Sequence, residues 1–198
     1  MVPSAREIQA AVAALDAGAL VAYPTETLYG LGVRAALPDA VARLYKVKGL
    51  APERGVSLLF RDFNAAEGYI VPTDVGRRLA RRLLPGPVTL VFEASRRAPP
   101  GVVAAGGTVG VRVSPHPVAS ALALRGPITS TSANPHGVAA PETAAEIRTL
   151  LGAAIGVVLD GGRCPGPGSS VVDVRGDTPR LLRVGRISRE AIEGATQA

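Results

Sequence analysis

Three cations and a set of hydroxyl and amide side chains are the residues of this sequence best suited to chemistry. Lys48 follows a predicted helix, and Arg112 and Arg183 lie in predicted strands. The polar side chains that follow predicted strands or loops are Thr25, Thr27, Thr131, Ser132, Asn134, Ser169 and Ser170. Ligands of open α/β sheets bind at strand ends, and guanidinium and ammonium groups bind phosphates and carboxylates. The pattern therefore predicts a site that holds a phosphate-bearing ligand beside a small polar substrate.

Each of these residues, taken alone, also has a structural interpretation. Arg112 and Arg183 are compatible with ordinary ion-paired strand residues, and the Ser and Thr side chains with turn caps. Lys48 lies near a predicted helix C-terminus, where a solvated cation is favoured. The prediction of a site rests on the number of such groups at strand ends rather than on any one of them.

Motifs that would indicate other chemistry are absent or incomplete. Residues 30–35 match the dinucleotide pattern G-x-G-x-x-A, but the preceding predicted strand ends at Pro24 and Pro38 interrupts the expected helix. The sequence has no G-x-x-x-x-G-K-[ST] phosphate loop and no G-x-S-x-G nucleophile elbow. We therefore expect neither a Rossmann-type site nor serine hydrolase chemistry, and bound ATP would be held by another design.

Metal-ligating residues are few. Cys164 is the single cysteine, which excludes an internal disulfide and a multi-cysteine zinc site. His116 and His136 are the only histidines, and both are expected in loops, His136 on the surface. We expect no metal bound by protein ligands and favour metal-independent polar chemistry.

The net charge of +6 suggests contact with a polyanion, although an arginine-rich composition alone gives the same balance. Within a predicted helix, Arg77, Arg78, Arg81 and Arg82 are spaced so that they form one basic face. One interpretation of this face is a solvated surface. The other is contact with the phosphate backbone of RNA, which would be sensitive to salt and blind to sequence.

The elements that must position these residues alternate between helices and strands. Helices are predicted over residues 4–16, 38–46, 72–84, 117–124 and 142–151, with a short last helix after Ser188. Strands are predicted over residues 20–23, 56–60, 88–92, 109–113, 127–131, 155–159, 171–174 and 180–184. Residues 24–32, 98–107 and 161–168 are predicted to be loops because glycine, proline or polar residues dominate them. The alternation predicts a single α/β domain over residues 1–198.

The composition excludes two broad classes of protein. Hydrophobic residues make up 47% of the chain, which excludes a disordered protein. No apolar run approaches the roughly 18 residues that a membrane span requires. The first residues lack the basic stretch and apolar core of a signal peptide, so a cytoplasmic location is expected.

The string YPTETLYGLG over residues 23–32 resembles the signature of the YrdC-type threonylcarbamoyl-AMP synthase family. Further matches follow in the family's order: KG at 48–49, PGPVTL at 85–90, GVRVSP at 110–115, STSAN at 130–134, SSVVD at 169–173 and LRVG at 182–185. The resemblance extends over residues 8–187. It is to the short, single-domain form of the family. It implies a twisted open mixed β-sheet flanked by helices, with a basic concavity.

The resemblance also implies an activity. The family makes threonylcarbamoyl-AMP and pyrophosphate from L-threonine, bicarbonate and ATP, with Mg²⁺ expected on the nucleotide. A second protein, a transferase, then moves the threonylcarbamoyl group to adenosine 37 of tRNA. The residues implied to contact threonine are Thr25, Arg112, Ser132 and Ser169, and those implied to contact ATP are Lys48, Thr108, Asn134 and Arg183. Of these, Lys48, Arg112 and Ser132 are implied in catalysis, because attack by an anionic carbamate on the α-phosphorus requires cations.

One departure from the family pattern bears on activity. The family reads Lys-x-Arg followed by Pro, whereas this chain has Leu50 and Ala51 after Lys48 and Gly49. Leu50 cannot donate a hydrogen bond to phosphate, and we hypothesise that Arg54 reaches back to replace the missing cation. Two alternatives stay open: a related protein without this activity that binds RNA or the ribosome, and an enzyme that makes another carbamoyl-type adenylate.

Overall fold

Ten strands form one mixed sheet whose order differs from the order of the chain. In the computed structural model, which describes residues 2–197, the order is β10-β9-β5-β6-β3-β7-β2-β1-β8, with β4 paired to the far end of β5. The strands are β1 Val21–Tyr23, β2 Gly30–Gly32, β3 Ser57–Leu59, β4 Ile70–Val71, β5 Val88–Ala94, β6 Thr108–Arg112, β7 Ile128–Ser132, β8 Val157–Val158, β9 Ser170–Asp173 and β10 Arg180–Arg183. The pairs β1·β8, β3·β6 and β5·β9 are parallel and the other pairs of this order are antiparallel, which confirms the predicted mixed α/β sheet.

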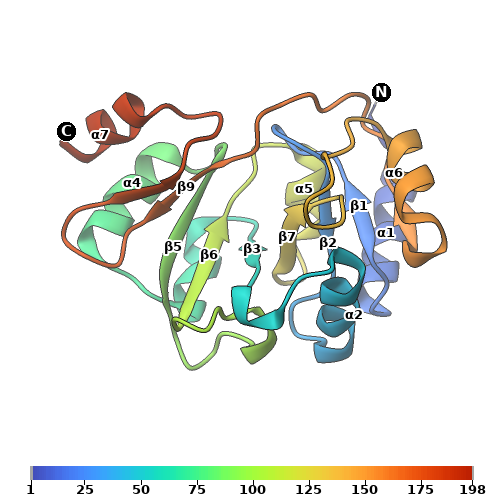
Figure 1. Cartoon of the computed structure of the whole chain (residues 1–198), viewed down its shortest axis with the longest axis horizontal. Coiled ribbons are helices and arrows are strands. Elements are labelled where there is room, and N and C mark those ends of the chain that lie inside the picture. Colours follow the sequence, from blue (N-terminus) through green and yellow to red (C-terminus); the bar gives the residue numbers. More distant parts are fainter. Residues whose placement is uncertain (1, 198) are drawn as a thin grey trace.

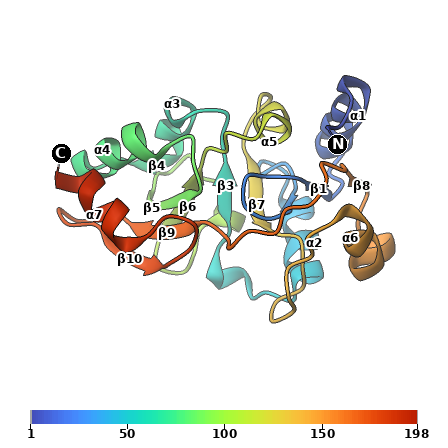
Figure 2. The same ribbon diagram turned by 90° about the horizontal axis from the view of Figure 1, so that it is seen from above.

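In the described part of the chain, seven α-helices flank this sheet, as Figures 1 and 2 illustrate. They are α1 Ala5–Asp16, α2 Pro38–Lys48, α3 Phe63–Ala66, α4 Asp74–Leu83, α5 Pro117–Leu122, α6 Ala144–Leu151 and α7 Arg189–Gln197. Short 3₁₀ turns lie at Pro52–Arg54, Glu67–Tyr69, Pro100–Val102 and Gly152–Ala154. Within residues 2–197, none of these helices has the length and apolar character needed to cross a bilayer.

The helix starts and stops follow the signals in the sequence. Ser4 and Glu7 form a reciprocal capping box at the start of α1, and the Thr73 hydroxyl caps α4. Helix α2 ends at Gly49, whose φ of 61° is left-handed and therefore suits glycine. This helix runs two residues further than predicted and so places Lys48 in its last turn.

Strand β2 corrects the prediction of a loop over residues 24–32. Gly30 and Gly32 were interpreted as loop signals, but both lie in β2, paired with β1 and β7. A Cβ atom at Gly30 would lie 2.6 Å from Cζ of the Tyr23 ring. The glycines are therefore needed for close packing within the sheet rather than for a turn.

The central strands of the sheet are buried on both faces, whereas the edge strand β10 is largely exposed. The neighbouring residues Leu58 and Leu59 of β3 belong to two different hydrophobic clusters because successive side chains of a strand point to opposite faces. One cluster includes Leu44 of α2, and the other includes Leu15 of α1 and Leu122 of α5. Rigid packing on both faces fixes the strand ends, from which the polar side chains extend.

A long connection between β8 and β9 runs across the molecule from one half of the sheet to the other (Figures 1 and 2). The backbone N–H of Cys164 donates to the Glu142 carbonyl at 2.8 Å, and that of Gly166 donates to the Thr27 carbonyl at 3.1 Å. The connection, predicted as a glycine-rich loop, thus passes beside the loop that follows β1. It delivers Ser169 to the start of β9.

Candidate functional site

A cavity of about 770 Å³ lies where the ends of several strands meet. Its lining comes from the loop after β1, the end of α2, the Pro52–Arg54 turn, the ends of β6 and β7, and the segments around β9 and β10. Four of its lining residues are cationic, namely Lys48, Arg54, Arg112 and Arg183, and none is Asp or Glu. Such a lining attracts anionic ligands, and the volume lies within the range of small-molecule sites.

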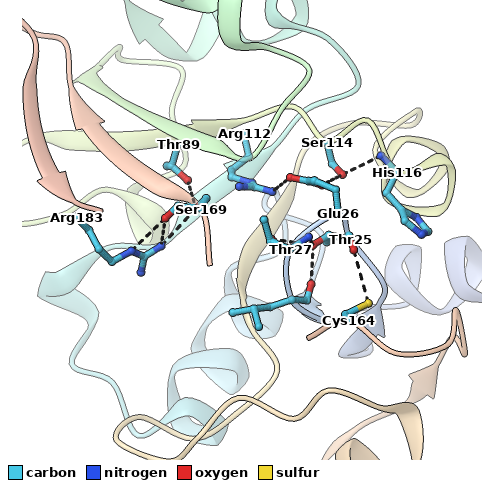
Figure 3. A network of polar contacts seen from close by, with 11 residues as sticks. Thr25, Glu26, Thr27, Thr89, Arg112, Ser114, His116, Cys164, Ser169 and Arg183 are labelled. Carbon is cyan, nitrogen blue, oxygen red and sulfur yellow. Dashed lines mark hydrogen bonds and ion pairs between the residues drawn. The ribbon is translucent and has the colours of Figure 1, made fainter. Parts of the chain in front are cut away.

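The loop after β1 contributes hydroxyl groups. Thr25 is buried, and its Oγ1 donates to the Leu28 carbonyl at 2.6 Å and accepts the Thr27 N–H at 3.1 Å. The two threonine hydroxyls lie 3.1 Å apart (Figure 3). These local bonds hold the loop in one conformation and keep both hydroxyls at the cavity wall.

Arg112 extends from the last position of β6 and is 5% exposed. Its Nη2 donates to Oε1 of Glu26 at 2.5 Å, while the Ser114 hydroxyl donates to the other carboxylate oxygen of Glu26 (Figure 3). Its other terminal nitrogen, Nη1, is buried and has no hydrogen-bond partner among the described residues. A buried donor without a partner is costly and marks a position that a ligand can satisfy.

Ser169, directly before β9, and Arg183, the last residue of β10, both line the cavity. The Ser169 hydroxyl lies 2.9 Å from the Thr89 hydroxyl of β5, and Nη2 of Arg183 donates to the Ser169 carbonyl at 2.8 Å (Figure 3). Loss of water around the guanidinium, and then the positive charge of Arg112, lower the pKa of Arg183. Two guanidinium groups thus share one cavity and favour an anion between them.

Lys48 reaches the cavity from the last turn of α2 and is only 3% exposed. Its Nζ donates to the Ser132 carbonyl at 2.5 Å and also to the Asn134 carbonyl. Burial lowers the pKa of Lys48 to about 8. The ammonium therefore joins α2 to the loop that follows β7 and brings Ser132 and Asn134 beside it.

The mouth of the cavity next to Lys48 holds Arg54 and His136. Nη1 of Arg54 lies 3.0 Å from Nε2 of His136, and both side chains are exposed as well as lining the cavity. Leu50 lines the same region, and no charge stands at its position. The structure therefore brings Arg54 to the cavity, while His136 was predicted only to be an exposed loop residue.

Several sequence-predicted residues lie elsewhere. Thr108 does not line the cavity: it opens β6 at the opposite end from Arg112, about 13 Å away at the usual rise of a strand. On α4, Arg77 pairs with Glu67, and Arg82 donates to the Ala195 carbonyl of α7 at 2.6 Å. Arg78 and Arg81 are exposed on the same helix, outside the cavity.

Sequence reasoning also missed residues that the structure places at or behind the cavity wall. Thr89 was assigned only to a strand, yet its hydroxyl contacts Ser169. Glu26 was noted only as part of a loop, yet it is the partner of Arg112. The sequence signal that could have identified Thr89 is its place as the one polar residue of the predicted strand 88–92.

Comparisons with known proteins extend over almost the whole chain. The profile of the Sua5/YciO/YrdC family, described as "Telomere recombination", matches residues 13–185. A threonylcarbamoyl-AMP synthase of Vibrio vulnificus is 37% identical over 185 residues, which cover 90% of this chain and 98% of the relative. A threonylcarbamoyl-AMP synthase of Bacillus subtilis is 35% identical over 192 residues, which cover 94% of this chain and 56% of the relative.

Solved structures of the same family also match this chain over almost its whole length. Sua5 of P. abyssi, solved in complex with L-threonine, has a TM-score of 0.89 and 33% identity, covering 96% of this chain and 57% of that one. YciO of E. coli also has a TM-score of 0.89, with 27% identity, covering 96% of this chain and 94% of that one. The chain is therefore similar in length to YciO and corresponds to part of Sua5.

Proposed function

Because the chain belongs to the Sua5/YciO/YrdC family, we propose that it is a threonylcarbamoyl-AMP synthase, a nucleotidyltransferase that uses ATP. The observation that carries this proposal is the cavity, in which Lys48, Arg112 and Arg183 converge and no carboxylate forms the lining. The reaction combines an amino acid with bicarbonate and a triphosphate, and each of the three carries an anionic group. A cavity with this charge suits all three.

The threonine subsite in this proposal lies between the loop after β1 and the start of β9. Arg112 would bind the substrate carboxylate, since a guanidinium suits that group. Thr25 and Ser169 supply hydroxyls beside it, at the cavity wall. The structure of a relative in complex with L-threonine supports a site of this kind in the family.

The nucleotide subsite would adjoin it. Lys48, Asn134 and Arg183 would contact ATP, with Ser132 at the junction of the two subsites. The threonine amine first joins bicarbonate to give a carbamate and water. A carbamate oxygen then forms a bond to the α-phosphorus, while the bond from that phosphorus to the bridging oxygen breaks and pyrophosphate leaves. Positioning and charge neutralisation supply the rate, and no covalent enzyme intermediate is needed.

Magnesium would enter with the nucleotide as part of the substrate. Within residues 2–197, no group of three or more His, Cys, Asp or Glu side chains could hold a metal ion, and the cavity lining contains no carboxylate. The triphosphate itself would therefore carry the ion, as is usual for Mg²⁺.

Arg54 would supply the cation that the family pattern places at Leu50. Its guanidinium lies at the mouth of the cavity, 3.0 Å from His136. His136 in turn donates its backbone N–H to the carbonyl of Lys48 at 2.7 Å. This chain of contacts puts the charge of Arg54 on the side of the cavity where the triphosphate would lie.

The product is a reactive adenylate, so a second enzyme must consume it. We propose a tRNA threonylcarbamoyl transferase as this downstream partner, with the reaction in the cytoplasm. Direct RNA contact is a second candidate function, favoured by the exposed Arg78 and Arg81 of α4. Salt-dependent RNA binding that is lost in the Arg78→Ala/Arg81→Ala variant would support it.

The test of the main proposal is product formation. Purified protein incubated with ATP, Mg²⁺, bicarbonate and L-threonine is expected to give threonylcarbamoyl-AMP by mass spectrometry, and a reaction without threonine is expected to give none. An adenylate of another mass would instead favour a different carbamoyl-type product. If ATP is not consumed, the proposal is wrong.

A further inference from the structure

We propose that Glu26 is a positioning residue that orients Arg112 for the carboxylate of the substrate. The inference rests on the proposed function, since it concerns the threonine subsite. Glu26 contacts Arg112 but does not line the cavity, so it acts through the arginine and not on the substrate. Glu26 lies in the YPTETLYGLG string of residues 23–32, but the resemblance implied no role for it.

The first support is that Glu26 contacts one terminal nitrogen of the Arg112 guanidinium and not the other. Its Oε1 accepts from Nη2 at 2.5 Å, and the side chains of the pair are 16% and 6% exposed. Nη1 stays buried without a partner among the described residues. One terminal nitrogen is thus fixed by the protein, which leaves the other as the donor for an incoming anion.

The second support is that Glu26 is itself held from behind. The Ser114 hydroxyl donates to its Oε2, and the same hydroxyl accepts the His116 backbone N–H at 3.1 Å (Figure 3). His116 caps the start of α5 with its ring, so this chain of contacts ends on a helix. A carboxylate held on both sides keeps the long arginine side chain in one rotamer, and less conformational freedom is then lost when a ligand binds.

An opposing interpretation gives the opposite result. A carboxylate paired with Arg112 could compete with the substrate carboxylate for the guanidinium. In that case the loss of the Glu26 charge would strengthen threonine binding. The sign of the change therefore distinguishes a positioning residue from a competitor.

The experiment compares Glu26→Gln, Glu26→Asp and the wild-type protein. Threonine affinity is measured by calorimetry without ATP, and the KM for threonine, the KM for ATP and kcat are measured with all substrates. For Glu26→Gln we expect threonine Kd and KM to rise about 10- to 100-fold, as for loss of an oriented charge-assisted contact. The KM for ATP is expected to stay within about 3-fold. Glu26→Asp, which keeps the charge, is expected to recover part of the affinity.

The control is Glu67→Gln, which removes an equal charge from an ion pair with Arg77 outside the cavity. It is expected to leave both KM values unchanged. Should Glu26→Gln fail to fold, Ser114→Ala removes the rear contact of Glu26, together with the bond from the His116 N–H, and a smaller rise in threonine Kd is expected.

Each outcome decides the proposal. Equal or tighter threonine binding by a folded Glu26→Gln variant overturns it, even where the wild-type protein makes product. An equal rise in the KM for both substrates indicates a structural role and also overturns it. If the wild-type protein neither binds threonine nor makes product, the proposed function is wrong and this inference falls with it.

Discussion

The backbone N–H of His136 donates to the carbonyl oxygen of Lys48 at 2.7 Å. In this bond Lys48 is the acceptor. Its side chain is a donor to the same loop, because Nζ donates to the carbonyls of Ser132 and Asn134. The end of α2 and the loop after β7 are therefore joined by main-chain and side-chain bonds. The position of the ammonium in the cavity depends on both.

The affinity for ATP is expected to depend on the protonation of Lys48. Burial lowers its pKa to about 8, so the group loses its charge as the pH rises through that value. We predict that the Kd for ATP, measured by calorimetry, rises between pH 7 and pH 9.5 in the wild-type protein. Lys48→Met should weaken binding about 10- to 100-fold at pH 7 and lose this pH dependence. Lys46→Met, two residues away and exposed, is the matched control. A pH-independent Kd in the wild-type protein would contradict the prediction.

The same lowered pKa predicts a change in stability. Between about 8 and the unfolded value of about 10.4, the unfolded chain binds more protons than the folded one. The free energy of unfolding should therefore rise with pH in this window, relative to Lys48→Met. Urea unfolding of both proteins at pH 7.5 and pH 10 measures the difference. A gap between the two proteins that stays constant would show that folding does not lower the pKa of Lys48.

Arg54→Ala is expected to lower activity about 30- to 1000-fold, the cost of losing one charge-assisted contact to the reacting phosphates. Adding Leu50→Arg to that variant should restore part of the loss, because it returns a cation to the same wall of the cavity. Arg61→Ala, which removes an exposed arginine paired with Asp62, is the control. Product formation by mass spectrometry gives the readout, and unchanged activity of Arg54→Ala would show that Arg54 does not serve the triphosphate.

Arg34 is expected to stabilise the fold without contributing to the site. Its guanidinium donates to Asp16 at 2.7 and 3.0 Å and to the Gly126 carbonyl at 2.9 Å. Arg34→Ala should lower the free energy of unfolding by about 2–4 kcal/mol, because it removes a buried side chain and several of its charge-assisted hydrogen bonds at once. Arg125→Ala removes the other, exposed partner of Asp16 and should cost less than about 1 kcal/mol. Equal losses in the two variants would show that burial of Arg34 is not the cause.

Gly30→Ala is expected to destabilise the protein through overpacking. The added Cβ would meet the Tyr23 ring at 2.6 Å, and overpacking of this kind costs about 1–3 kcal/mol. Gly176→Ala is the control, since nothing lies within 4 Å of the added atom there. Thermal unfolding of the two variants measures the difference. A Gly30→Ala protein as stable as the control would show that β2 tolerates a side chain.

Most helices and strands could be predicted from the sequence because capping residues and apolar runs are local signals, whereas the short elements β2, α3 and β4 were missed. Arg112 and Arg183 could be predicted to line one cavity because strand ends of an α/β sheet lie together, whereas Lys48 reaches it from the end of α2. Other features depend on contacts between distant residues. Glu26 meets Arg112 only because the loop after β1 lies beside the end of β6, and 86 residues separate the two in the chain.

Strand β2 also depends on a contact between residues that the sequence alone does not bring together. A glycine that permits close packing and a glycine that permits a turn look alike in a sequence, and only the Tyr23 ring distinguishes them. Thr108 was predicted to contact ATP by resemblance, but its place at the start of β6 follows from the register with β5, where it lies opposite Glu93. The side chains that meet across the sheet are set by register, which composition does not encode.

The pairing of β5 with β9 has a consequence for folding during synthesis on the ribosome. β5 is an inner strand whose β9 edge is completed only by residues near the end of the chain. Ser169 and Arg183 emerge with those residues, so a nascent chain that has completed β1–β8 still carries an open strand edge and an unfinished cavity. The cavity is therefore completed only after β9 and β10 have been synthesised and have docked against β5.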